Sequence, residues 1–70
     1  MPYVNIKVTE EGVTDEQKAA LIEGSTQLLA QVLGKDPNTT FVVIDEIDLS
    51  NWGIGGVPVQ AYRKRAAAGR

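Results

Sequence analysis

The sequence contains no cysteine and no histidine among its 70 residues. Disulfide bridges are therefore excluded, and so are the usual zinc sites, which need these side chains as ligands. Aromatic residues are also few, with one tryptophan, two tyrosines and one phenylalanine. A chain this short buries only a limited part of its surface, and small domains without disulfides or metals are usually stabilised by association. We therefore expect self-association to supply the missing stability.

Long hydrophobic runs and an excess of positive charge are absent as well. No apolar stretch approaches the length of a transmembrane helix, and the N-terminal segment lacks the apolar stretch of a signal peptide. The net charge of −2 gives no general case for nucleic-acid binding. We therefore expect a cytoplasmic protein with no membrane partner and no nucleic-acid partner.

The chain is nevertheless rich enough in apolar residues to fold. Hydrophobic side chains make up 43% of it, which is too many for a disordered tail. Its length corresponds to one small domain, and we expect a single domain over residues 1–70. Residues 60–70 contain several basic residues and alanines, which would suit either a short helix or a flexible tail.

Four segments have recognisable patterns. Residues 2–9 alternate between apolar and polar side chains, which predicts a β-strand. Thr14 starts a capping-box pattern, and apolar residues then recur at helical spacing as far as the expected helix stop at Gly34. The continuous apolar run at residues 41–44 favours a strand buried on both faces, as in parallel sheets. Three glycines within residues 53–56 predict tight turns, in a compact hairpin or an exposed loop.

A strand, a helix and a strand in this order form a βαβ unit with an expected right-handed crossover. The predicted fold class is therefore α/β (α+β), a β-α-β subunit with a C-terminal β-hairpin. One face of a two-stranded sheet would stay bare to water in such a subunit. Burial of that face against a second copy would give an oligomer with shared sheets.

Four features coincide along roughly the first 56 residues. The chain opens with Met1-Pro2, a Thr-Asp-Glu-Gln-Lys segment at residues 14–18 begins the expected helix, and residues 41–47 form the expected second strand. Trp52 is then followed by Gly-Ile-Gly-Gly. In this combination and at these distances, the sequence resembles the 4-oxalocrotonate tautomerase family.

The resemblance implies a cofactor-independent tautomerase, an isomerase, that acts on a small molecule and forms a homohexamer built as a trimer of dimers. It also implies that Met1 is removed and that Pro2 becomes the general base. A free amine acts as a base near neutral pH only if a desolvated pocket or a nearby cation lowers its pKa. It would then transfer a proton between enol and keto forms of a small 2-oxo or 2-hydroxydienoate or phenylenolpyruvate-like substrate. Considered by itself, Pro2 would also suit the edge of a strand.

Two positions depart from the family pattern. The family has one arginine after the glycine that precedes the helix and another early in the second strand, where this chain has Val13 and Phe41. A guanidinium group is hard to replace in carboxylate recognition, so a dicarboxylate such as 2-hydroxymuconate is disfavoured. A more apolar enol or ketone fits better. We expect Phe41 and Trp52 to form apolar walls of the substrate-binding pocket and Tyr3 to donate a hydrogen bond to a carbonyl.

Other functions stay open. Related family reactions such as hydration, dehalogenation or decarboxylation need carboxylate-binding arginines or a carboxylate that activates water. A catalytically silent oligomer would keep the fold without turnover, and the loss of both arginines favours it. Trp52 could also be an interface anchor. Asn5, Lys7, Asp45 and Arg63 are more simply explained as exposed strand or tail residues.

Overall fold

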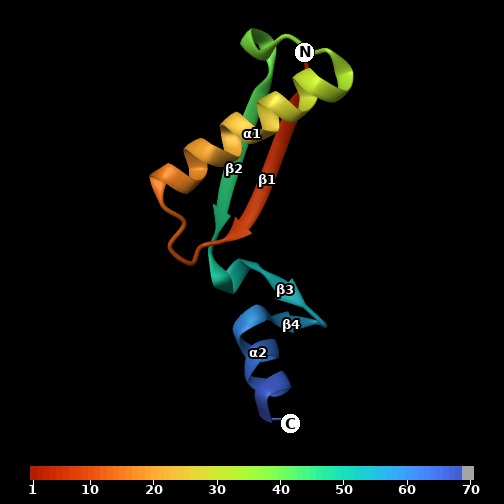
Figure 1. Ribbon diagram of the computed structural model, residues 1–70. Helices are drawn as coiled ribbons and strands as arrows, with labels where there is room; N and C mark the ends of the chain where they lie inside the picture. Colours follow the sequence, from red (N-terminus) through yellow and green to blue (C-terminus); the bar gives the residue numbers. More distant parts are fainter. Residues whose placement is uncertain (69–70) are drawn as a thin grey trace.

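Two parallel strands form the sheet in a computed structural model of the chain, which describes residues 1–68 (Figure 1). They are β1 (Tyr3–Thr9) and β2 (Phe41–Ile47), and the helix α1 (Asp15–Leu33) connects them across one face of the sheet. The predicted β-α-β arrangement is therefore confirmed.

The caps of α1 set its limits. The Thr14 hydroxyl oxygen accepts a hydrogen bond from the Gln17 backbone N–H at 3.1 Å, and the Gln17 side-chain oxygen accepts one from the Thr14 backbone N–H at 2.9 Å. This is the capping box that the sequence predicted. Gly34 ends the helix with a φ of 67°, in the left-handed region that glycine adopts without steric cost.

The two faces of the sheet have different surroundings. Lys18 of α1 pairs with Glu46 of β2, so α1 covers the face on which Glu46 lies. The register places eight residues on the opposite, uncovered face: Tyr3, Asn5, Lys7 and Thr9 of β1 beside Phe41, Val43, Asp45 and Ile47 of β2. Val43 there is 41% exposed, so the prediction that this strand is buried on both faces is wrong for a single chain. The second face would need another molecule to cover it.

The remainder of the chain extends from the end of the sheet where both strands finish (Figure 1). A 3-10 turn at Leu49–Asn51 leads into the predicted hairpin, made of β3 (Gly53–Ile54) and β4 (Val57–Pro58). The helix α2 (Val59–Ala68) follows directly. Of the two alternatives for the tail, the helix is therefore present up to Ala68. A second 3-10 turn at Pro37–Thr39 precedes β2.

The two glycines at the tip of the hairpin explain its tight turn. Gly55 and Gly56 have φ values of 61° and 83°. Positive φ at both central residues is what a two-residue hairpin turn needs to match the twist of its strands. The Val59 backbone N–H donates to the Trp52 carbonyl oxygen at 2.8 Å and closes the base of the hairpin.

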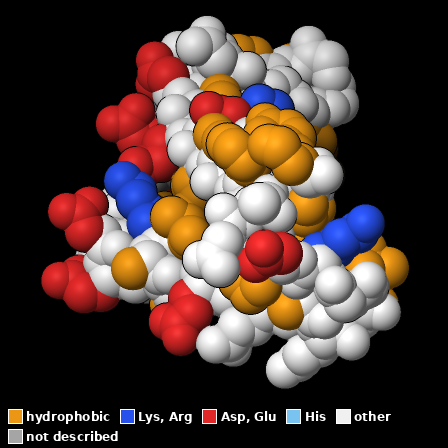
Figure 2. Space-filling view, turned by 90° about the horizontal axis from the view of Figure 1, so that it is seen from above, with side chains coloured by type: hydrophobic (Ala, Val, Ile, Leu, Met, Phe, Trp, Pro, Cys, Tyr) orange, Lys and Arg blue, Asp and Glu red, His pale blue; other side chains and the backbone are white. Residues whose placement is uncertain are grey.

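The single chain has almost no interior. Val59, at 8% exposure, is the only buried residue among residues 1–68. Leu28, Val32 and Leu33 of α1 are 59%, 69% and 59% exposed. Figure 2 shows hydrophobic side chains in patches across the end view of the molecule, with acidic side chains along one side. Neither described helix has the length and apolar character needed to cross a lipid bilayer.

Candidate functional site

Pro2 lies at the end of the sheet where both strands begin. It is half-buried, and its carbonyl oxygen accepts a hydrogen bond from the Phe41 backbone N–H at 3.0 Å. This bond fixes the Pro2 backbone to the start of β2. Met1 precedes it and is 84% exposed. While Met1 is attached, the Pro2 nitrogen is an amide and cannot take up a proton near neutral pH.

Two of the predicted substrate-binding residues lie at this same end. Tyr3 and Phe41 are direct neighbours across β1 and β2 on the uncovered sheet face. They are 64% and 54% exposed, so both rings are available for contact with a small molecule or another subunit. The structure therefore brings Phe41 and Tyr3 close to Pro2 in the chain fold.

Trp52 lies at the other end of the sheet. It follows the 3-10 turn beyond β2, and each strand has seven residues. At about 3.3 Å per residue, the sheet separates Pro2 from Trp52 by roughly 20 Å. A pocket that contains both residues therefore cannot form within one chain. This separation was not evident in the sequence, where both residues were expected to line one pocket.

Val13 lies at the Trp52 end as well. It belongs to the connection between β1 and α1, and the Glu10 backbone N–H donates to the Ile47 carbonyl oxygen at 2.7 Å where this connection leaves the sheet. Val13 lines an open groove along the first half of α1 with Gln17, Ala20 and Leu21. The position at which the family resemblance implied an arginine thus has an apolar side chain, in a largely apolar groove.

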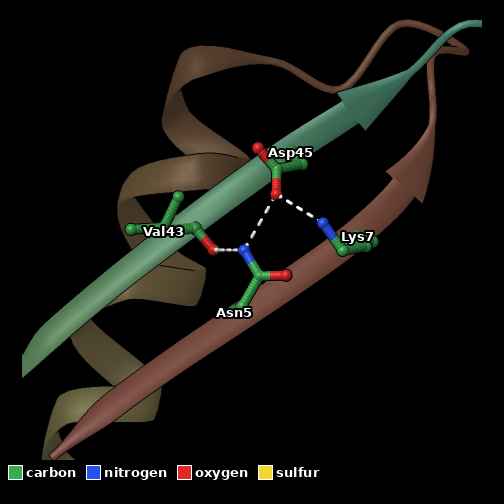
Figure 3. A network of polar contacts seen from close by, with 4 residues as sticks. All are labelled: Asn5, Lys7, Val43 and Asp45. Carbon is green, nitrogen blue, oxygen red and sulfur yellow. Dashed lines mark hydrogen bonds and ion pairs between the residues drawn. The ribbon is translucent and has the colours of Figure 1, made fainter.

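A polar network lies in the middle of the uncovered sheet face (Figure 3). One oxygen of Asp45 accepts hydrogen bonds from the Lys7 ammonium and from the Asn5 side-chain amide, each at 2.9 Å. The same amide lies 3.4 Å from the Val43 carbonyl oxygen. The bond from Lys7, with that from Asn5, lowers the pKa of Asp45. A carboxylate held in this way is a poor proton acceptor, and these residues are explained as a sheet-surface network.

A second polar contact was missed in the sequence. The Arg63 guanidinium of α2 donates two hydrogen bonds to the Glu11 carboxylate, at 2.6 and 3.2 Å, and the Thr9 hydroxyl donates to the same carboxylate. Arg63, followed by Thr9, lowers the pKa of Glu11 to about 2. The two charged residues are 52 positions apart and share no local pattern, so only their opposite charges could have suggested the pair.

Comparison with known proteins gives consistent results. The sequence model of a family described as "Tautomerase enzyme" matches residues 2–62. A relative from Dickeya dadantii named as a "Probable tautomerase" is 57% identical over 67 residues, which cover 96% of this chain and 100% of the relative. The crystal structure of DmpI from Helicobacter pylori has a TM-score of 0.83 at 45% identity and covers 90% of this chain and 97% of that one.

A third similar protein is described as a heterohexamer 4-oxalocrotonate tautomerase, from Chloroflexus aurantiacus. Its structure has a TM-score of 0.77 at 25% identity and covers 86% of this chain and 95% of that one. The β-α-β subunit with a hairpin, and a proline at the start of its first strand, is thus the fold of a tautomerase subunit. More specifically, the chain belongs to the 4-oxalocrotonate tautomerase family.

Proposed function

We propose that this chain is a cofactor-independent tautomerase that interconverts the enol and keto forms of a small 2-oxo acid carrying an apolar group. The ring nitrogen of Pro2, set free by removal of Met1, is the general base. The observation that carries the proposal is the position of Pro2. The chain belongs to a tautomerase family, and Pro2 lies directly before β1 at the open end of the sheet. Its carbonyl oxygen accepts a hydrogen bond from the Phe41 backbone N–H.

The proposed reaction needs one proton carrier. The lone pair of the Pro2 nitrogen takes the proton of the enol hydroxyl group. The enol oxygen becomes a carbonyl oxygen, and the electron pair of the carbon–carbon double bond moves to the carbon that does not carry the oxygen. The protonated ring then gives the same proton to that carbon, which restores the free amine and balances the reaction. Efficient transfer requires an amine pKa near the working pH, and an apolar pocket lowers it by disfavouring the charged form.

The proposed pocket is completed by a second subunit. Within one chain the sheet keeps Trp52 and Val13 away from Pro2, while a homohexamer, arranged as a trimer of dimers, would bring them to the Pro2 of a neighbour. The uncovered sheet face and the exposed apolar side chains of α1 support such an assembly. A related protein described as a heterohexamer supports it as well.

The proposed substrate is apolar at the end remote from its 2-oxo group. Val13 and Phe41 occupy the two positions at which the family pattern has arginines, and neither can bind a carboxylate. With Trp52 they would surround an aryl or alkyl group, and the Tyr3 hydroxyl would donate a hydrogen bond to the carbonyl oxygen. Phenylenolpyruvate has these features, whereas 2-hydroxymuconate carries a second carboxylate at the apolar end.

A direct assay tests the proposal. Mass spectrometry first establishes that the purified protein lacks Met1, and the rates with phenylenolpyruvate and with 2-hydroxymuconate are then compared. We expect a higher kcat/KM for phenylenolpyruvate. The matched control is a chain with an uncleaved N-terminal extension, in which the Pro2 nitrogen stays an amide and turnover should disappear. Equal activity of the extended chain would refute Pro2 as the base, and a clear preference for the dicarboxylate would refute the apolar pocket.

A further inference from the structure

Two segments meet at the Trp52 end of the sheet. One is the connection from β1 to α1, residues 10–14, which carries Val13. The other is the C-terminal unit of residues 52–68, which consists of Trp52, the hairpin and α2. In the proposed site both segments face the same substrate, so their relative position decides how much room an apolar group has.

The C-terminal unit is internally well connected. The bond from Val59 to the Trp52 carbonyl joins the first turn of α2 to the residue before the hairpin, and Val59 is buried there. The Tyr62 ring lies against the turn, since a Cβ built on Gly55 would be 3.4 Å from it. A displacement of α2 would therefore displace Trp52 as well.

The Glu11–Arg63 pair links this unit to the other segment. Both terminal nitrogens of Arg63 are used, one on each carboxylate oxygen, and the Thr9 hydroxyl donates a further hydrogen bond to one of these oxygens. A two-pronged contact between a planar guanidinium and a carboxylate fixes orientation as well as distance. Lys64 and Arg65 follow in α2, but neither has an ion pair with any residue between 1 and 68, so the contact is specific to one cation of the three.

We infer that the Glu11–Arg63 pair is a positioning device that holds Trp52 at a fixed place relative to Val13. Its effect on catalysis rests on the proposed function, because it sets the width of the apolar pocket that these two residues would line. In the proposed mechanism the reacting groups are the Pro2 nitrogen and the enol, and neither charged residue has a part in the proton transfer. Loss of the pair should therefore weaken the binding of a bulky substrate while proton transfer at Pro2 is retained.

Trp52 is the only tryptophan in the chain, so its fluorescence reports its surroundings without any enzyme assay. The test compares acrylamide quenching of Trp52 in the assembled wild-type protein, Arg63→Gln, Glu11→Gln and the control Lys64→Gln. We expect stronger quenching in the first two variants and no change in Lys64→Gln. The exchanged double variant Glu11→Arg with Arg63→Glu restores opposite charges and should return quenching toward the wild-type value.

Activity provides the second measurement. In Arg63→Gln we expect a several-fold rise in KM for phenylenolpyruvate with kcat almost unchanged, which a general loss of structure would not produce. Wild-type protein gives a test that needs no variant: raising the salt concentration should screen this exposed pair and increase Trp52 quenching, and the salt effect should be absent in Arg63→Gln.

The possible outcomes separate the two proposals. Unchanged quenching in both single variants, or a salt effect that persists in Arg63→Gln, overturns the positioning role. If no enol substrate is turned over but quenching responds as expected, the proposed function fails and the positioning of Trp52 stands. A lowered kcat with unchanged KM would also overturn the role, because it would place Arg63 in the chemical step.

Discussion

The separation of Pro2 from Trp52 has a quantitative consequence for mixed oligomers. Seven strand residues place the two about 20 Å apart in one chain, so each proposed site takes Pro2 from one subunit and Trp52 from another. Two chains, each impaired in one of these residues, can then complement each other. One is the N-terminally extended chain, in which Pro2 is blocked and Trp52 is intact; the other is Trp52→Ala with a free Pro2.

Equal amounts of the two chains are unfolded together in guanidinium chloride, refolded, and assayed with phenylenolpyruvate. If subunits assort at random, half of the sites receive a free Pro2 and half of those an intact Trp52, so about one quarter of wild-type activity should return. The controls are the two chains refolded separately and then mixed in the assay. Activity no higher than the mean of these controls would refute a site shared between subunits.

Three further predictions concern stability and specificity. Thr14→Ala removes the capping box and should lower the free energy of unfolding by about 1 kcal/mol, measured by urea titration at fixed protein concentration. Glu11 has a folded pKa of about 2 against an ordinary value of 4.5. Its contribution to stability is therefore complete above pH 4.5 and lost as the pH falls toward 2, and Glu11→Gln should flatten this part of the stability profile. Phe41→Arg introduces the cation that the family resemblance implied at this position and should lower KM for 2-hydroxymuconate several-fold.

Each of these has a matched comparison. Thr26 is in the middle of α1, and its hydroxyl group donates a hydrogen bond to the Ile22 carbonyl oxygen of the same helix. Thr26→Ala should therefore not lower the free energy of unfolding as Thr14→Ala does. An acid profile in Glu11→Gln identical to that of the wild type would contradict the role of the ion pair. Phe41→Leu controls for the loss of the ring; if it improves dicarboxylate binding as much as Phe41→Arg, the added charge is not the cause.

The local structure of this chain follows closely from its sequence. The alternation in residues 2–9, the cap pattern at Thr14, the stop at Gly34 and the glycines of the hairpin each act within a few residues, and each was found as predicted. The tail was ambiguous because alanine and arginine favour a helix while a chain end favours fraying. Packing of Val59 and Tyr62 against the hairpin favours the helix.

The site could be predicted less well, because its residues come from distant parts of the chain. Proximity of Phe41 to Pro2 follows from the parallel register, which a βαβ unit implies. The placement of Trp52 at the opposite end depends on the direction in which the chain leaves β2. The contact between Glu11 and Arg63 depends on how the hairpin places α2 beside the connection from β1 to α1. No periodic pattern in the sequence indicates either placement.

The near-absence of an interior also affects how the subunit exists in a cell. Val59 is the one buried side chain among residues 1–68, so burial of apolar surface stabilises an isolated subunit only weakly. Association with further subunits would increase its stability by mass action. A copy that stays unassembled would therefore be more open to proteolysis than an assembled one. A related chain with the same uncovered sheet face could bind to the same subunits and form mixed oligomers. Sequence divergence on this face is therefore the simplest way for two such proteins in one cell to assemble separately.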